Sequence, residues 1–160
     1  EDCSRRETPE VPFVVGVEGG AGDTGQLVAG VRSLRDRYEV AADTVDAIGD
    51  IVREGESLLA AADPESDPSA ELIGELGELM DINHGLLSAL GVSSRSLDTM
   101  VWAAREAGAD GAKLTGAGGG GCIVALDATT ETETSLQYTP DCEQAFRAEL
   151  ATDGVRVEDE

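Results

Sequence analysis

A run of glycines is the part of this sequence whose residue types and spacing could most clearly do chemistry. Five of the six residues in 116–121 are glycine, and Ala117 is the exception. So many glycines forfeit too much backbone entropy for a regular element, and the apolar segments on either side, 112–115 and 122–126, are typical of strands. Bare backbone between two strands presents several N–H groups to one side, which suits anionic oxygens or the close approach of another loop. A tight turn without a ligand is the alternative interpretation.

Two familiar phosphate-binding motifs do not fit this glycine loop. A P-loop ends in Gly-Lys-Ser/Thr, whereas Gly121 is followed by Cys122. A dinucleotide-binding fingerprint requires a helix after its glycines, whereas an apolar strand is expected here. Any binding of anions by the loop would therefore have to use a different arrangement.

Histidine and cysteine are too sparse for several kinds of site. His84 is the only histidine, and Cys3, Cys122 and Cys142 show no Cys-x-x-Cys spacing. We therefore expect no multi-histidine metal site, no zinc or disulfide framework, and no choice of bases for a Ser-His-Asp triad. Cys122 is expected to be a small core residue, and His84, which falls off the apolar stripe of its helix, is expected to be solvated.

Three other side chains stand out, each with two interpretations. Asn83 interrupts an apolar stripe, so we expect a buried, hydrogen-bonded asparagine, with a ligand-binding role as the alternative. Lys113 is the sole lysine among eleven basic residues, and a salt-bridged strand lysine is expected rather than a site residue. Trp102 lies off the inward face of its helix and is expected to mark a packing or subunit contact.

Hydrophobic periodicity predicts the elements that must hold these residues. Asp23 precedes Gln26 in a capping-box pattern at the start of the first helix. The expected helices are 24–38, 41–62, 68–90, 94–107 and 141–150, and the expected strands are 11–17, 112–115, 122–126 and 155–157. In the third helix Pro68 is expected at the first position with Asp67 as the cap, in the fourth Ser93 as the cap, and in the last Phe146 and Leu150 facing inward. The segment 127–139 is expected to be mostly loop. This order predicts an α+β fold, with helices layered on a mainly antiparallel sheet of about four strands.

Charge excludes some partners. The chain has 33 acidic and 11 basic residues, a net charge of −22 over 160 residues. Nucleic acids and anionic membranes both require basic surfaces, so neither is an expected partner. No segment approaches the ~20 consecutive apolar residues of a membrane span, and no signal peptide is apparent. An acidic coat spread along the whole chain, with lysine nearly absent, indicates the cytoplasm of a salt-adapted organism, where repulsion between carboxylates is screened; an ordinary acidic protein is the alternative.

The amino-acid sequence of the glycine loop resembles a conserved motif of a known enzyme superfamily. The segment from Lys113 to Cys122, KLTGAGGGGC, closely resembles the third conserved motif of the galactokinase, homoserine kinase, mevalonate kinase and phosphomevalonate kinase superfamily, and is most similar to that of the mevalonate kinases. The segment 23–32 resembles the helix start that follows the central strand pair in those enzymes. Three further segments look like their later helices: 79–83, 86–92 and 96–98. Order and spacing agree with the family over roughly residues 11–126.

The resemblance implies an enzymatic activity and a second, N-terminal domain whose motifs this sequence lacks. It implies ATP-dependent phosphorylation of the 5-hydroxyl of mevalonate, with Mg²⁺, in isoprenoid biosynthesis. Members of the family have two domains, and the first supplies a Pro-x-x-x-Gly-Leu-Gly-Ser-Ser loop around ATP, the magnesium carboxylate and a catalytic Asp. None of these occurs here, and the chain begins at Glu1 without a methionine. Residues 1–160 are therefore expected to be the C-terminal kinase domain without its N-terminal ATP-binding domain. That domain would bind most of the ATP and Mg²⁺, so this chain would hold no catalytic residue and no metal ligand and would be inactive alone.

The same resemblance implies which residues line the active site. They are Thr24, Thr115, Gly116, Ala117, Gly118, Gly119, Gly120 and Gly121. Thr24 resembles the threonine whose hydroxyl faces the substrate and the catalytic Asp, although it could instead be a second helix cap beside Asp23. Thr115 could equally be an ordinary strand residue.

Two rival functions remain open at this point. One is another kinase of the superfamily, such as a phosphomevalonate kinase or a decarboxylase relative. The other is a non-catalytic binding or oligomerisation module, which the missing first domain would favour. A homodimer is a candidate assembly for either.

Overall fold

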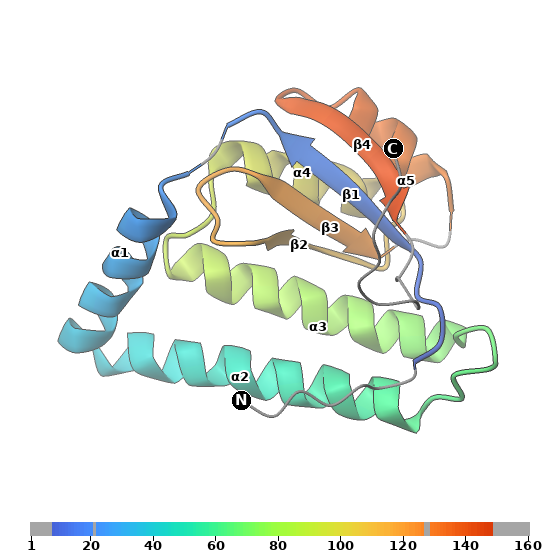
Figure 1. Ribbon diagram of the computed structural model, residues 1–160, viewed down its shortest axis with the longest axis horizontal. Coiled ribbons are helices and arrows are strands. Elements are labelled where there is room, and N and C mark those ends of the chain that lie inside the picture. The colour runs from blue at the N-terminus through green and yellow to red at the C-terminus, as the bar shows by residue number, and fades with distance from the viewer. Residues whose placement is uncertain (1–7, 21, 127–128, 149–160) are drawn as a thin grey trace, which may run out of the picture.

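The computed structural model describes residues 8–20, 22–126 and 129–148 (Figure 1). Its elements, in chain order, are β1 (Phe13–Glu18), α1 (Thr24–Arg37), α2 (Glu39–Ala61), α3 (Ala70–Ala89), α4 (Arg95–Glu106), β2 (Gly111–Thr115), β3 (Cys122–Leu126), α5 (Glu131–Gln137) and β4 (Cys142–Ala148). No helix in these ranges has both the length and the apolarity that crossing a bilayer would require.

The four strands form one sheet in the order β2-β3-β1-β4, with every neighbouring pair antiparallel. The register places Lys113, Val124, Val15 and Phe146 in one row across the sheet. Their alternate neighbours point to the other face, which gives each strand one side turned toward the main core.

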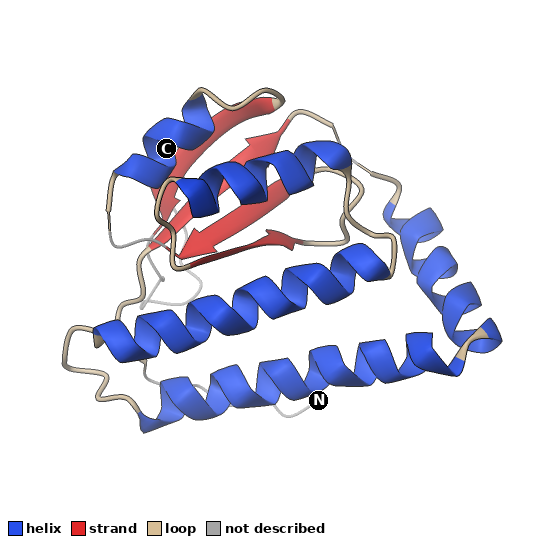
Figure 2. Ribbon diagram, turned by 180° about the vertical axis from the view of Figure 1, so that it is seen from behind, coloured by secondary structure: helices blue, strands red, loops and turns tan. Residues whose placement is uncertain are grey.

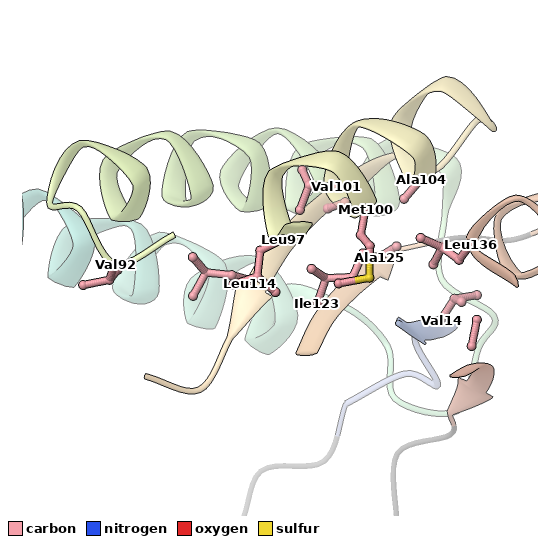
Figure 3. Packing of buried hydrophobic residues seen from close by; sticks show 12 residues of the cluster. Val14, Val92, Leu97, Met100, Val101, Ala104, Leu114, Ile123, Ala125 and Leu136 are labelled. Carbon is pink, nitrogen blue, oxygen red and sulfur yellow. The ribbon is translucent and has the colours of Figure 1, made fainter. Parts of the chain in front are cut away.

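Helices cover the two faces of this sheet unequally. Helices α4 and α5 lie together on one face, whereas α3 lies along β2 at the edge of the sheet and α2 packs outside α3 (Figures 1 and 2). The main core lies under α4 and α5. Twelve buried residues build it, among them Leu97, Met100, Leu114, Ile123 and Leu136 (Figure 3). The α+β class predicted from the sequence is confirmed.

The starts of the first four helices agree with the sequence to within two residues, and serine caps explain the shifts of α3 and α4. Ser69, rather than Asp67, caps α3 by accepting the N–H of Leu72, so Pro68 lies before the helix. Ser94, rather than Ser93, caps α4 by accepting the N–H of Leu97. In each case a serine hydroxyl satisfies an otherwise unpaired N–H group of the first turn.

The last third of the chain differs from the prediction. Residues 142–148, expected within a helix, form β4, because pairing with β1 overrides a weak local helical pattern. As a result Ala145 faces the core and Phe146, expected to face inward, is 39% exposed. Leu150 and the predicted strand 155–157 lie outside the described residues.

The expected loop at 127–139 contains a short helix, α5. Thr132 and Leu136, four residues apart, are both fully buried, and α5 packs on α4. This i, i+4 pair is enough to fold a Thr/Glu-rich segment onto the core, because tertiary packing supplies most of the stability of a short helix.

Candidate functional site

The glycine loop connects β2 to β3 in a conformation that only glycine adopts easily. Gly116, Gly118, Gly119, Gly120 and Gly121 have φ values of 82°, 85°, 68°, 135° and 93°. A side chain would be strained at each of these angles. The five glycines are therefore required by the path of the backbone, whatever the loop binds.

Backbone hydrogen bonds tie this loop to two other segments. The N–H of Gly119 donates to the carbonyl of Val92 at 2.7 Å, and the N–H of Gly121 donates to the carbonyl of Gly20 at 2.9 Å. The N–H of Glu18 donates to the carbonyl of Gly121 at 2.7 Å. The N–H groups of Gly119 and Gly121, which could have bound an anion, therefore hold the loop in place instead.

The other four N–H groups of the loop make no backbone hydrogen bond to a described residue. Those of Gly116, Ala117, Gly118 and Gly120 donate to no backbone carbonyl within the ranges that the structure describes. Gly116 also has open space where a side chain would begin. The loop can therefore present backbone donors.

The start of α1 lies against the same loop. A Cβ atom at Gly22 would lie 2.8 Å from the carbonyl oxygen of Gly118 and 2.9 Å from that of Gly119, so the two backbones are in contact. One at Gly119 would lie 2.9 Å from Cδ1 of Leu27, in the first turns of α1. Thr24, the first residue of α1, is exposed and follows Gly22 by two positions, beside the cap Asp23.

The structure thus brings together the segments that carry the predicted site residues. Thr115 ends β2 directly before the loop and is half-buried. Thr24 begins α1, two positions after Gly22, whose backbone contacts the loop. A groove of about 350 Å³ runs beside Ala117, and Arg32 and Arg35 of α1 are its basic lining residues, with mostly apolar residues around them.

Acidic and hydroxyl side chains occupy the other flank of the loop, at the start of α4. Ser96 donates to Oε1 of Glu18 at 2.5 Å, and Ser93 donates to Oδ1 of Asp98 at 2.5 Å. The second oxygen of the Glu18 carboxylate is buried and has no hydrogen-bond partner. Among the residues described, no three His, Cys, Asp or Glu side chains gather in a way that could hold a metal ion.

Sequence reasoning missed a cluster that fixes the strand leading into the loop. His84, expected to be solvated, is only 7% exposed. Its Nδ1 accepts the N–H of Leu114 at 3.3 Å. One turn earlier on α3, Oδ1 of Asp81 accepts the N–H of Ala112 at 2.9 Å and lies 2.8 Å from the guanidinium of Arg105. The three-residue spacing of Asp81 and His84 on one helix face is the signal that could have found them.

Burial lowers the pKa of His84 below its usual value, and Arg105 acts in the same direction, while Asp98 and Asp81 oppose the shift. The dominant cause is the loss of solvent around the charged imidazolium. The neutral ring is the form that can accept the N–H of Leu114 at Nδ1.

Two more predictions concern Asn83 and Lys113. Asn83 is buried, at 6% exposure, as expected, but within the described part of the chain its amide makes no hydrogen bond. Lys113 was expected in a salt bridge, and none of the described carboxylates lies within ion-pair distance of it. Its Nζ donates instead to the carbonyl of Leu114 at 2.8 Å. Trp102 is 61% exposed, as expected.

Comparison with known proteins shows which proteins this chain is similar to. A family model described as the C-terminal part of the GHMP kinases matches residues 69–137. The mevalonate kinase of Thermococcus gammatolerans is 42% identical over 152 residues, and that of Pyrococcus horikoshii is 44% identical over 157 residues. Both alignments cover 94% of this chain and 44% of the relative. The chain therefore spans less than half the length of these relatives.

Solved structures agree with the sequence matches. The structure of the L. major mevalonate kinase in complex with R-mevalonate superimposes with a TM-score of 0.76 at 28% identity, over 89% of this chain and 43% of that one. The Methanococcus jannaschii mevalonate kinase gives a TM-score of 0.62 at 26% identity, over 88% of this chain and 39% of that one. Residues 69–137 therefore match the model of the GHMP kinase C-terminal part, in a chain that is similar to mevalonate kinases over nearly its whole length.

Proposed function

We propose that this chain is the C-terminal part of a mevalonate kinase, which transfers a phosphoryl group from ATP to the 5-hydroxyl of mevalonate. The observation that carries the proposal is 42–44% identity to mevalonate kinases over 94% of the chain. A glycine loop held against the start of α1 supports it, because this loop and α1 carry the segments that resemble the family.

The chemistry that these residues can supply is positioning. Phosphoryl transfer needs cations on the phosphate oxygens and a group that orients the nucleophile. The loop offers backbone N–H groups, and Thr24 and Thr115 offer hydroxyls, so the described residues fit contact with a substrate or a phosphate. They do not fit a magnesium site, because they contain no cluster of ligands. We infer that an N-terminal domain supplies the Mg²⁺ carboxylate, the catalytic Asp and most of the ATP site.

The cellular setting belongs to the same proposal. The even acidic coat supports the cytoplasm of a salt-adapted organism, because carboxylate repulsion is screened there. The same coat supports a small-molecule substrate rather than a nucleic acid or a membrane surface. A homodimer is the assembly that we would test first.

The test is an assay of the full-length protein with ATP and one acceptor at a time. We expect ADP release with mevalonate, and much less with phosphomevalonate, homoserine or galactose. Thr24→Ala should lower kcat, whereas Thr99→Ala, on the exposed side of α4, should not. Turnover of phosphomevalonate in preference to mevalonate would overturn the substrate assignment, and the absence of turnover with all four acceptors would overturn the kinase assignment.

A further inference from the structure

An apolar cavity lies on the other side of the molecule from the core under α4 and α5. It has a volume of about 340 Å³ and lies between α2, α3 and the sheet. Apolar side chains line most of it, among them Phe13, Leu59, Leu76, Leu79 and Met80. A cavity of this size and composition is typical of a site for a small molecule.

Two polar side chains line this otherwise apolar cavity, and each has hydrogen-bonding groups that no described residue uses. They are Asn83 of α3 and Lys113 of β2. The amide of Asn83 is more than nine-tenths buried and has no hydrogen-bond partner among the described residues. An amide that lines a cavity without a partner among the described residues keeps its N–H₂ donors and its oxygen acceptor available to a ligand.

The ammonium of Lys113 is also incompletely paired. It donates one hydrogen bond, to the carbonyl of Leu114, and in the described ranges it meets no carboxylate. This is unexpected in a chain with 33 acidic residues. Burial lowers the pKa of Lys113, because the charged ammonium loses solvent.

We propose that this cavity binds a small amphiphilic carboxylate, with the apolar chain among the side chains of α2 and α3 and the carboxylate on Lys113 and Asn83. The ammonium and the amide N–H₂ are both donors, and a carboxylate accepts from both. A single unpaired cation matches one negative charge, because a second charge in this apolar setting would remain uncompensated. The proposal does not depend on the kinase activity, since the glycine loop does not line the cavity.

The experiment is titration calorimetry on the full-length protein with hexanoate, octanoate and decanoate. We expect one binding site, with affinity rising by about fourfold for each methylene group up to the length that fills the cavity. Octanol and octylammonium, which lack the negative charge, should bind at least tenfold more weakly than octanoate. Equal affinity for octanoate and octylammonium, or no binding of any carboxylate, would overturn the proposal.

Three variants locate the site. Lys113→Met and Asn83→Leu should each weaken octanoate binding at least tenfold, whereas Arg53→Met, which removes an exposed cation on α2, should not. Gly55→Leu should block binding by filling the cavity, because a Cβ at Gly55 would lie 3.8 Å from Leu79, at ordinary contact distance. Circular dichroism checks folding, and in the wild type octanoate should shift the side-chain amide resonances of Asn83. Unchanged resonances, or full affinity in Gly55→Leu, would refute the location even if Lys113→Met failed to fold.

Discussion

Nε2 of His84 lies 3.2 Å from Oδ1 of Asp98, while Nδ1 of the same ring accepts the N–H of Leu114 at 3.3 Å. Because Nδ1 accepts, the proton of the neutral ring is on Nε2, facing the carboxylate. One imidazole therefore joins α3, α4 and β2 just before the glycine loop begins.

This arrangement predicts a pH dependence of stability. The pKa of His84 is lowered in the folded protein, so the unfolded chain binds the proton more readily. The stability associated with the neutral ring is therefore fully present above about pH 6.5 and is lost as the pH falls through that value toward the lowered pKa. Urea unfolding in 2 M KCl should show this loss between pH 7 and pH 5.

The comparison variant for that prediction is His84→Asn, whose Oδ1 can replace the acceptor at Nδ1 but does not titrate. Its free energy of unfolding should depend less on pH over this interval than that of the wild type. Protonation of the many carboxylates affects both proteins alike, so it cancels in the difference. Identical pH dependence in the two proteins would show that His84 does not carry the effect.

A second prediction concerns the contact between α3 and β2. Gly77 and Gly111 face each other so closely that a Cβ on Gly77 would overlap the carbonyl of Asp110. Gly77→Ala should therefore destabilise the protein by about 1–3 kcal/mol, as overpacking of a tight contact does. Gly74→Ala, one turn earlier with open space around it, should stabilise by up to about 1 kcal/mol. Equal effects in thermal unfolding would argue against the close contact.

A third prediction separates the docking of the glycine loop from its strained backbone. Alanine at Gly116 or Gly118 has a similarly unfavourable positive φ, which costs of order 1–3 kcal/mol. At Gly118 the new methyl group would also overlap the carbonyl of Val92, which accepts the N–H of Gly119. Gly118→Ala should therefore be the less stable variant in urea unfolding. Its kcat per folded molecule in the full-length enzyme should also fall further. The reverse order would contradict the observed docking.

A fourth prediction concerns salt. With a net charge of −22, repulsion between carboxylates should destabilise the fold at low ionic strength, where the Debye length is longer and the repulsion is screened less. The thermal midpoint should rise from 0.1 M to 2 M KCl by more than it does for a neutral protein of similar size. Sulfate is unsuitable here because it strengthens apolar burial in general. An unchanged or lower midpoint would remove the support for salt adaptation.

The parts of the fold that could be predicted are those whose signals are local. The strand 122–126 was predicted with its exact bounds, because the apolar run that forms it is itself the signal. Helix α1 was predicted to within one residue, because its cap Asp23 directly precedes it. The glycine loop was recognisable because its composition excludes regular structure. In contrast, β4 depends on pairing with β1 more than 120 positions earlier in the sequence, and no local pattern reports such a partner.

Some residues of the candidate site could also be identified from the sequence, and others could not. Thr24, Thr115 and the loop glycines were identified from the resemblance, and the structure brings their segments together. His84 and Asp81 were not identified, because their acceptor atoms serve backbone N–H groups of β2, about thirty positions away in the sequence. Helical periodicity places His84 off the apolar stripe, so it does not reveal that this polar side chain is buried against the edge of β2.

The outer side of β2 has a consequence for how this protein behaves in a crowded solution. This edge strand exposes backbone groups at Ala112 and Leu114, and side chains occupy all four of them: Asp81 and His84 accept the N–H groups, and Arg105 and Lys113 donate to the carbonyls. An open edge of this kind is a template for another chain to add a strand. Here side chains, rather than an extra strand, occupy those backbone groups and close that route to aggregation.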